Sequence, residues 1–223
     1  MITAFLDVDS SVRRHLEASG FWVLTATIVM VFLAIPGSTA AQQKARKPSR
    51  PLRKPDVIYY STPPETVDEM LRMAAIKPGD VLYDLGSGDG RIPVAAAQRF
   101  GIRAVGVEID PKLVSEGEEN ARKANVASLV RFRNEDMFVI SLREATVVTL
   151  YLSEKLNVLL RPKLLRELRP GSRIISHDFR MGDWPPEETV RVPWLKGFRT
   201  VYKWTVPPAK TNANRGYLRR GPR

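Results

Sequence analysis

Residues 82–91 combine an apolar strand pattern with a turn of alternating glycines, and this segment constrains the fold more than any other. It reads Leu-Tyr-Asp-Leu-Gly-Ser-Gly-Asp-Gly-Arg, so that Asp84, Gly86, Gly88 and Gly90 occupy every second position. Glycine adopts backbone conformations that other residues avoid, and it places no Cβ between the chain and a ligand. The sequence therefore predicts a strand that ends in a tight, ligand-binding turn.

Two ligand classes fit such a turn, namely dinucleotides and S-adenosylmethionine. The dinucleotide motif G-x-G-x-x-G/A would need a third small residue at position 91, where this chain has Arg91. The carboxylates of Asp84 and Asp89 would repel a pyrophosphate, whereas they suit the ammonium and sulfonium charges of S-adenosylmethionine. Charge therefore favours S-adenosylmethionine as the ligand.

A further carboxylate follows at the spacing of a ribose-binding acid. Residues 103–110 read Arg-Ala-Val-Gly-Val-Glu-Ile-Asp, a second strand that ends at Glu108, 18 residues after Gly90. In a βαβ unit, an acid at about this distance accepts hydrogen bonds from the ribose hydroxyls. The alternative is that Glu108 caps a helix over 111–125 or is a solvated loop residue.

These motifs resemble those of the class I S-adenosylmethionine-dependent methyltransferases. Asp84 to Gly90 matches the first motif of that family and Glu108 the second, while residues 134–137, Asn-Glu-Asp-Met, look like the adenine-binding segment. Two residues before the first predicted helix, Tyr60 and Thr62, are placed to close over the cofactor. The resemblance implies cofactor contacts at Tyr60, Thr62, Asp84, Gly86, Ser87, Gly88, Asp89, Gly90, Glu108, Ile109, Asp136 and Met137.

Wider segments sharpen the resemblance. They are Tyr-Ser-Thr-Pro-Pro-Glu-Thr-Val at 60–67, Val-Val-Thr-Leu-Tyr-Leu at 147–152, and Ser-His-Asp-Phe at 176–179 followed by Trp184-Pro. Together with the glycine turn they look like the bacterial relatives of mitochondrial protein-lysine methyltransferases that act on membrane proteins of energy metabolism. The resemblance covers about residues 58–206 and implies lysine as the methyl acceptor.

The expected fold class is α/β, a Rossmann-like methyltransferase fold with a mostly parallel seven-stranded sheet and an antiparallel C-terminal strand. Thr62 is expected to N-cap the first helix, which begins at Pro63-Pro64. Pro162 is expected to kink or split the last helix. Strands are predicted at 80–85, 103–109, 129–132, 145–152, 172–178 and 198–206, and further helices at 90–100, 111–125 and 154–168.

Candidate catalytic groups lie where the fourth and fifth predicted strands end, because open α/β sheets bind ligands at the carboxyl ends of their strands. Tyr151 follows one strand, and His177 and Asp178 follow the other. His177 is a candidate general base, Asp178 could orient an acceptor amine, and Tyr151 could line the methyl channel. Hydrogen bonding, loop capping and packing are the respective structural alternatives.

The net charge of +11 is concentrated in two tails. Residues 42–55 carry +6 and residues 207–223 carry +5, whereas 56–206 carry only +1. Polybasic tails of this kind suit an anionic bilayer without any need for nucleic acid, although they could also serve only to keep the chain soluble. The chain has no cysteine and two histidines, which excludes disulfides and argues against a zinc site.

The N-terminal region carries a targeting signal of one of two kinds. Residues 21–35 are uncharged and mostly apolar, about 22 Å long as a helix, which is shorter than the hydrocarbon core of a bilayer. We expect an uncleaved membrane anchor with a cytoplasmic catalytic domain, because six basic residues follow the stretch and two precede it. The alternative is a signal peptide cleaved near residues 40–41, with export of the domain.

The expected organisation is therefore an anchor or signal peptide at 1–41, a basic linker at 42–57, a methyltransferase domain at 58–206 and a basic tail at 207–223. The function predicted for it is methylation of a lysine side chain of a protein, at a membrane. The alternatives are a small-molecule or lipid methyltransferase and a non-catalytic membrane protein that binds S-adenosylmethionine. Nucleic acid is the partner class that the neutral core favours least.

Overall fold

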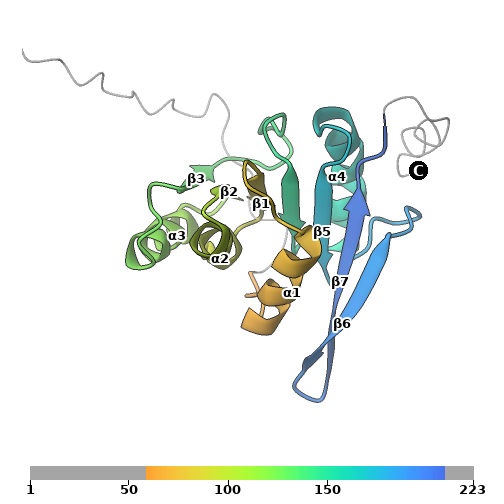
Figure 1. Cartoon of the computed structure of the whole chain (residues 1–223), viewed down its shortest axis with the longest axis horizontal. Helices are drawn as coiled ribbons and strands as arrows, with labels where there is room; N and C mark the ends of the chain where they lie inside the picture. Colours follow the sequence, from red (N-terminus) through yellow and green to blue (C-terminus); the bar gives the residue numbers. More distant parts are fainter. Residues whose placement is uncertain (1–58, 209–223) are drawn as a thin grey trace, which may run out of the picture. The chain divides into compact units, whose positions relative to one another are not determined.

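The predicted glycine turn follows the strand β1 (Val81–Leu85), which lies in the middle of a seven-stranded sheet. The computed structural model describes residues 59–208. The strand order is β3-β2-β1-β4-β5-β7-β6, with β1 to β5 parallel, β7 antiparallel to β5, and β6 antiparallel to β7 (Figure 1). The other strands are β2 (Arg103–Glu108), β3 (Val130–Asn134), β4 (Val147–Leu150), β5 (Arg173–His177), β6 (Glu188–Trp194) and β7 (Gly197–Thr205).

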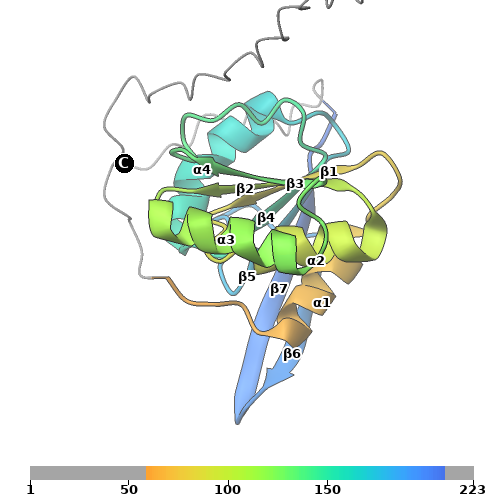
Figure 2. The same ribbon diagram turned by 90° about the vertical axis from the view of Figure 1, so that its left-hand side faces the viewer.

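Helices cover both faces of this sheet. The helices α1 (Pro64–Ala74), α2 (Arg91–Phe100) and α3 (Pro111–Lys123) lie on one face, and α4 (Glu154–Glu167) lies on the other (Figure 2). Successive residues of a strand point to opposite faces, so Leu82 joins the core under α1 and α2, whereas Leu85 packs under α4. The predicted fold class is confirmed.

Three details of the sequence-based expectation were wrong. The strand β6 was not foreseen, since only six of the seven expected strands were located in the sequence; it lies at the edge of the sheet, a position that tolerates its Pro193. Pro63, rather than Thr62, is the N-cap residue of α1, and the Thr62 hydroxyl lies 3.2 Å from Nδ1 of His177 instead. Pro162 does not split α4, which runs on unbroken with Leu160 and Leu164 buried on either side, while the expected kink stays a prediction.

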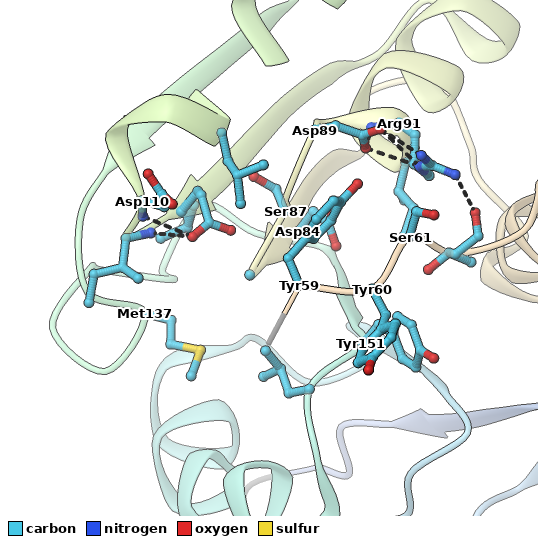
Figure 3. Close-up of a pocket in the computed structure, with 18 of the residues that line it drawn as sticks. Tyr59, Tyr60, Ser61, Asp84, Ser87, Asp89, Arg91, Asp110, Met137 and Tyr151 are labelled. Carbon is cyan, nitrogen blue, oxygen red and sulfur yellow. Dashed lines mark hydrogen bonds and ion pairs between the residues drawn. The ribbon is translucent and has the colours of Figure 1, made fainter. Parts of the chain in front are cut away.

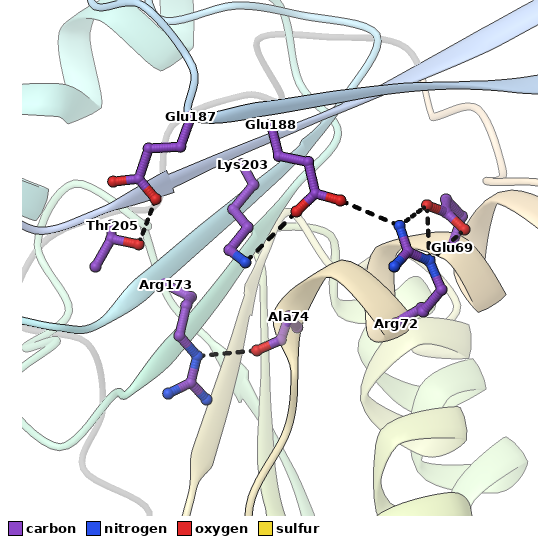
Figure 4. Close-up of polar contacts among 8 residues, drawn as sticks. All are labelled: Glu69, Arg72, Ala74, Arg173, Glu187, Glu188, Lys203 and Thr205. Carbon is purple, nitrogen blue, oxygen red and sulfur yellow. Dashed lines mark hydrogen bonds and ion pairs between the residues drawn. The ribbon is translucent and has the colours of Figure 1, made fainter.

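Polar contacts join α1 to the β6–β7 hairpin (Figure 4). Arg72 donates to Glu69 on its own helix and to Glu188, whose carboxylate also pairs with Lys203 at 3.6 Å. Arg173 of β5 donates to the carbonyl of Ala74 at 2.9 Å. Exposed ion pairs contribute little to stability, so these contacts fix the orientation of the hairpin more than they stabilise the fold.

The predictions for residues 1–41 and 42–57, and for 209–223 of the predicted tail, concern segments outside the described residues. Among residues 59–208, no helix has the length and apolar character needed to cross a membrane.

A cluster of glycines makes room for one aromatic ring beside the turn. A Cβ at Gly90 would lie 2.3 Å from the Phe132 ring, and Cβ atoms at Gly106 and Gly117 would come within 2.6 Å of it. The Phe132 ring therefore fills the space left by three glycines from α2's N-cap, β2 and α3. Gly90 thus has a packing role, which its place in a ligand-binding motif did not suggest.

We expect Gly90→Ala to lower the free energy of unfolding by about 2–4 kcal/mol, because a left-handed backbone strains alanine and the new methyl overpacks against Phe132. Gly101→Ala is the matched control, since Gly101 also has a positive φ but has open space at its Cβ position. It should cost only about 1 kcal/mol. Equal losses in chemical denaturation would contradict the packing role.

Candidate functional site

A cavity of about 480 Å³ opens at the carboxyl ends of the parallel strands, within the size range of small-molecule sites (Figure 3). The turn after β1, the end of β2 and the segments that follow β3 and β4 supply its walls, with residues 59–62 alongside. Its lining includes the carboxylate residues Asp84, Asp89, Glu108, Asp110, Glu135 and Asp136. The cavity is therefore acidic, as a cationic ligand requires.

The glycine turn is held against β2 by backbone hydrogen bonds. The N–H groups of Gly86 and Ser87 both donate to the carbonyl of Val107, at 2.9 and 3.1 Å. The next glycine, Gly88, has φ +53°, and a Cβ there would lie 2.2 Å from the ring of Tyr59. The absence of a side chain at Gly88 thus lets the ring of Tyr59, which also lines the cavity, lie against the turn.

Glu108 fixes the far side of this turn. One carboxylate oxygen accepts from the Gly88 N–H at 2.9 Å, and the other accepts from the N–H groups of Ile109 and Asp110 at 2.7 and 3.0 Å. The side chain is buried yet lines the cavity. It therefore does not cap α3, which Asp110 caps by accepting from Lys112. A buried carboxylate oriented by three N–H groups is preorganised to accept ligand hydroxyls.

Asp84 is a buried carboxyl at the floor of the cavity. Burial raises its pKa to about 7. The hydrogen bond that Asp84 accepts from Thr149 at 2.7 Å opposes this increase, whereas the nearby charges of Glu108 and Asp89 add to it. A cation placed here would favour the charged carboxylate and so would bind most tightly when Asp84 is ionised.

Asp89 does not present a free charge to the cavity, because Arg91 binds both of its oxygens. Burial acts to raise the Asp89 pKa, but the hydrogen bonds and charge of Arg91 bring it below its ordinary value. Arg91 also donates to the carbonyl of Thr62 at 2.8 Å. Arg91, which argues against a dinucleotide motif at position 91, thus links the turn to the segment before α1.

The segment after β3 forms the end of the cavity opposite Tyr60, with Met137 as an apolar wall (Figure 3). Asp136 lies beside it and accepts from the Phe138 N–H at 2.9 Å. An apolar face next to a carboxylate suits an adenine ring and its amino group, the roles that the sequence predicted for these two residues.

Most of the predicted cofactor residues line the cavity, the exceptions being Gly88 and Gly90, which shape the turn from behind. Sequence reasoning missed Tyr59, Ser61, Arg91, Ile92, Val107, Asp110, Leu113, Glu135, Leu152 and Leu156. The aromatic pair Tyr59-Tyr60 was a usable signal for one of them. The apolar residues gave none, since their pattern is that of core positions.

The three predicted catalytic residues lie next to one another, and only Tyr151 lines the cavity. The Tyr151 ring stacks on that of His177, with centroids 3.8 Å apart and an angle of 27° between the rings, and lies near that of Phe179. His177 is fully buried, and burial lowers its pKa to about 4 despite the opposing charge of Asp178. The Asp178 carboxylate accepts from Arg199 at 3.0 Å and from the Thr200 N–H at 2.8 Å.

His177 and Asp178 thus lie behind Tyr151 rather than at the cavity. A neutral, buried imidazole with such a low pKa is a poor general base at pH 7. Its contacts with Tyr151 and Thr62 instead suit the positioning of two cavity residues.

The chain is similar to known proteins in sequence and in fold. The family described as the ANTKMT methyltransferase domain matches residues 84–188. A protein-lysine N-methyltransferase of Saccharolobus islandicus is 39% identical over 153 residues, which are 68% of this chain and 95% of that protein. The mouse adenine nucleotide translocase lysine N-methyltransferase is 36% identical over 63% of this chain and 60% of its own length.

A solved structure agrees with these sequence matches. The RNA methyltransferase of Salinibacter ruber, in complex with S-adenosylhomocysteine, is 51% identical, with a TM-score of 0.64 over 69% of this chain and 97% of its own. The predicted cofactor is thereby confirmed, and the chain is an enzyme of the methyltransferase class. It belongs to the family of S-adenosylmethionine-dependent methyltransferases that contains these protein-lysine N-methyltransferases.

Proposed function

We propose that this enzyme transfers the methyl group of S-adenosylmethionine to the ε-amine of a lysine in a protein. The observation that carries the proposal is the similarity to a protein-lysine N-methyltransferase across almost the whole of that relative. The acidic cavity, which fits a cationic cofactor, supports S-adenosylmethionine as the methyl donor.

Tyr60 and Tyr151 are the proposed walls of the acceptor entrance. The two rings lie close together at the end of the cavity away from Met137 (Figure 3). Burial raises the pKa of Tyr151, so its hydroxyl stays protonated at pH 7 and its oxygen can accept a hydrogen bond from an amine. Aromatic faces also attract an alkylammonium group before it loses its proton.

The bound cofactor supplies a methyl group on a positively charged sulfur. The chain's residues then have to align the acceptor nitrogen in line with the breaking carbon–sulfur bond and keep water out. The amine must be neutral to attack, and a lysine with pKa of about 10.4 is almost fully protonated at pH 7. Since His177 and Asp178 lie behind Tyr151, we propose that the proton leaves to solvent before attack.

RNA is a second candidate acceptor, because the 51% identical solved structure is named as an RNA methyltransferase. The cavity argues against it, since its lining is rich in carboxylates and its Arg91 is held by Asp89. Phosphate groups that entered the cavity would be repelled by these carboxylates.

An incubation of the enzyme with methyl-labelled cofactor and with membrane, soluble-protein and RNA fractions distinguishes protein lysine from RNA as the acceptor. We expect protease-sensitive label in protein and mass-spectrometric assignment to lysine Nε. Gly88→Val is the inactive control, because its side chain would displace Tyr59 and the turn. Label that ribonuclease releases, with none on lysine, would overturn the proposal.

The affinity for S-adenosylhomocysteine should depend on pH through Asp84. If the ionised carboxylate binds the ligand ammonium, affinity is full above pH 7 and falls as pH decreases, approaching a tenfold loss per pH unit below the Asp84 pKa of about 7. Calorimetry between pH 5 and 8 measures this. Asp84→Asn should bind more weakly at pH 8 and lose the pH dependence; a wild-type affinity that is constant over this range would contradict the assignment.

Tyr151→Phe should lower kcat by up to about tenfold while the affinity for S-adenosylhomocysteine stays within about twofold, because one hydrogen bond to the acceptor is lost.

His177→Gln tests the positioning role of His177 through the pH dependence of kcat. We expect a lower kcat with an unchanged profile that still rises with pH. Loss of a titrating limb in His177→Gln would instead make His177 the base.

A further inference from the structure

The turn of the β6–β7 hairpin breaks a local rule of protein structure. Leu195 and Lys196 link the last residue pair, Trp194 and Gly197. Leu195 has φ +50°, a left-handed conformation that glycine, asparagine and aspartate tolerate far better than leucine. The adjacent Gly197 does not use its freedom in this way. A leucine at this position is therefore conformationally unfavourable.

The same leucine gains no burial in return. Its side chain is 89% exposed, and nearby Phe198 is 55% exposed. An exposed apolar side chain in a strained turn offers the folded chain no compensating contact, which is the pattern expected of a functional surface.

The apex of the hairpin is also cationic. Residues 189–199 contain Arg191, Lys196 and Arg199 but no acidic residue, and of these Arg199 pairs with Asp178 at 3.0 Å. Lys196 is exposed beside Leu195, and the Arg191 guanidinium lies 4.4 Å from the centroid of the Phe198 ring. An aliphatic and aromatic apex among basic groups matches the interface of an anionic bilayer, where apolar groups insert and cations meet phosphate.

Strand register places this apex on the side of the cavity. Val201 pairs with His177, the last residue of β5, so residues 197–200 continue past the edge of the sheet where the cavity opens. Four residues of β7 extend about 13 Å beyond that edge at the strand rise. Figure 1 shows the hairpin projecting beyond the other elements of the sheet.

We propose that the apex of this hairpin, Trp194 to Phe198, docks the enzyme on an anionic lipid surface with its cavity turned toward the membrane. Nucleic acid fits the apex less well, because Leu195 at its tip offers no ring for base stacking and the Arg191 guanidinium already lies over the ring of Phe198. The proposal goes beyond the lysine assignment and depends on no property of the acceptor. The test of membrane docking requires no turnover, so the docking proposal and the lysine-methylation proposal can fail separately.

The chain has no cysteine, so a single introduced one can carry a probe of polarity. Lys196→Cys labelled with nitrobenzoxadiazole reports on the apex, and Lys77→Cys reports on the opposite edge, before β1. Vesicles of phosphatidylglycerol and phosphatidylcholine should shift the emission of the full-length protein to shorter wavelength at position 196 and not at 77. No shift at 196, equal shifts at both positions, or a shift with single-stranded RNA but not with vesicles would overturn the proposal.

A second variant separates docking from folding. Leu195→Asn keeps the turn and relieves its backbone, so its Tm should equal or exceed that of the wild type. The vesicle-induced emission shift of the probe at 196 should then need about tenfold more lipid, because the inserted leucine is gone. Phe100→Ser, at a partly exposed apolar position outside the hairpin, is the control and should leave the lipid requirement unchanged. An unchanged lipid requirement in Leu195→Asn would contradict insertion of the apex.

Discussion

The hydrogen bond from the Gly88 N–H to the Glu108 carboxylate joins the two halves of the cofactor site. It links the glycine turn after β1 to the end of β2, and it exists only because Gly88 takes a left-handed conformation next to Tyr59. The same carboxylate orders the start of α3 through Ile109 and Asp110. Without this bond, the glycine turn, the end of β2 and the start of α3 would no longer be held together by one carboxylate.

The site also depends on how charge is distributed around that turn. Arg91 compensates Asp89, whereas Asp84 and Glu108 face the cavity with no arginine or lysine bonded to their carboxylates in the described part of the chain. A cationic ligand would therefore meet two buried carboxylates. Folding has already removed most water from these carboxylates, so that ligand binding does not add this free-energy cost. This arrangement explains why a turn that resembles a dinucleotide motif suits a sulfonium cofactor instead.

The sequence predicted the parts of this structure that depend on local pattern. The glycine turn, the acid that ends β2 and the alternation of strands and helices all follow from residue spacing, and they specified both the fold and the cofactor. Pattern could not show that Gly90 accommodates Phe132, which lies more than forty residues away. Nor could it show that Tyr151 covers His177, because a strand end looks the same whether its side chain faces the cavity or the core.

Two other corrections have the same origin. The strand β6 was not located from the sequence, and its place at the edge of the sheet, which makes Pro193 acceptable, is visible only in the structure. Thr62 had the right residue type for an N-cap, but tertiary contact with His177 determines its role. Long-range packing, which leaves no periodic trace in the chain, decided each case.

The central claim is that the cofactor lies across the glycine turn between Asp84 and Glu108. A crystal structure with S-adenosylhomocysteine tests this most directly. We expect the ligand ammonium within hydrogen-bonding distance of Asp84, both ribose hydroxyls at Glu108 and the adenine against Met137. Ribose hydroxyls that contact neither Glu108 nor the turn, or a ligand bound outside this cavity, would contradict it.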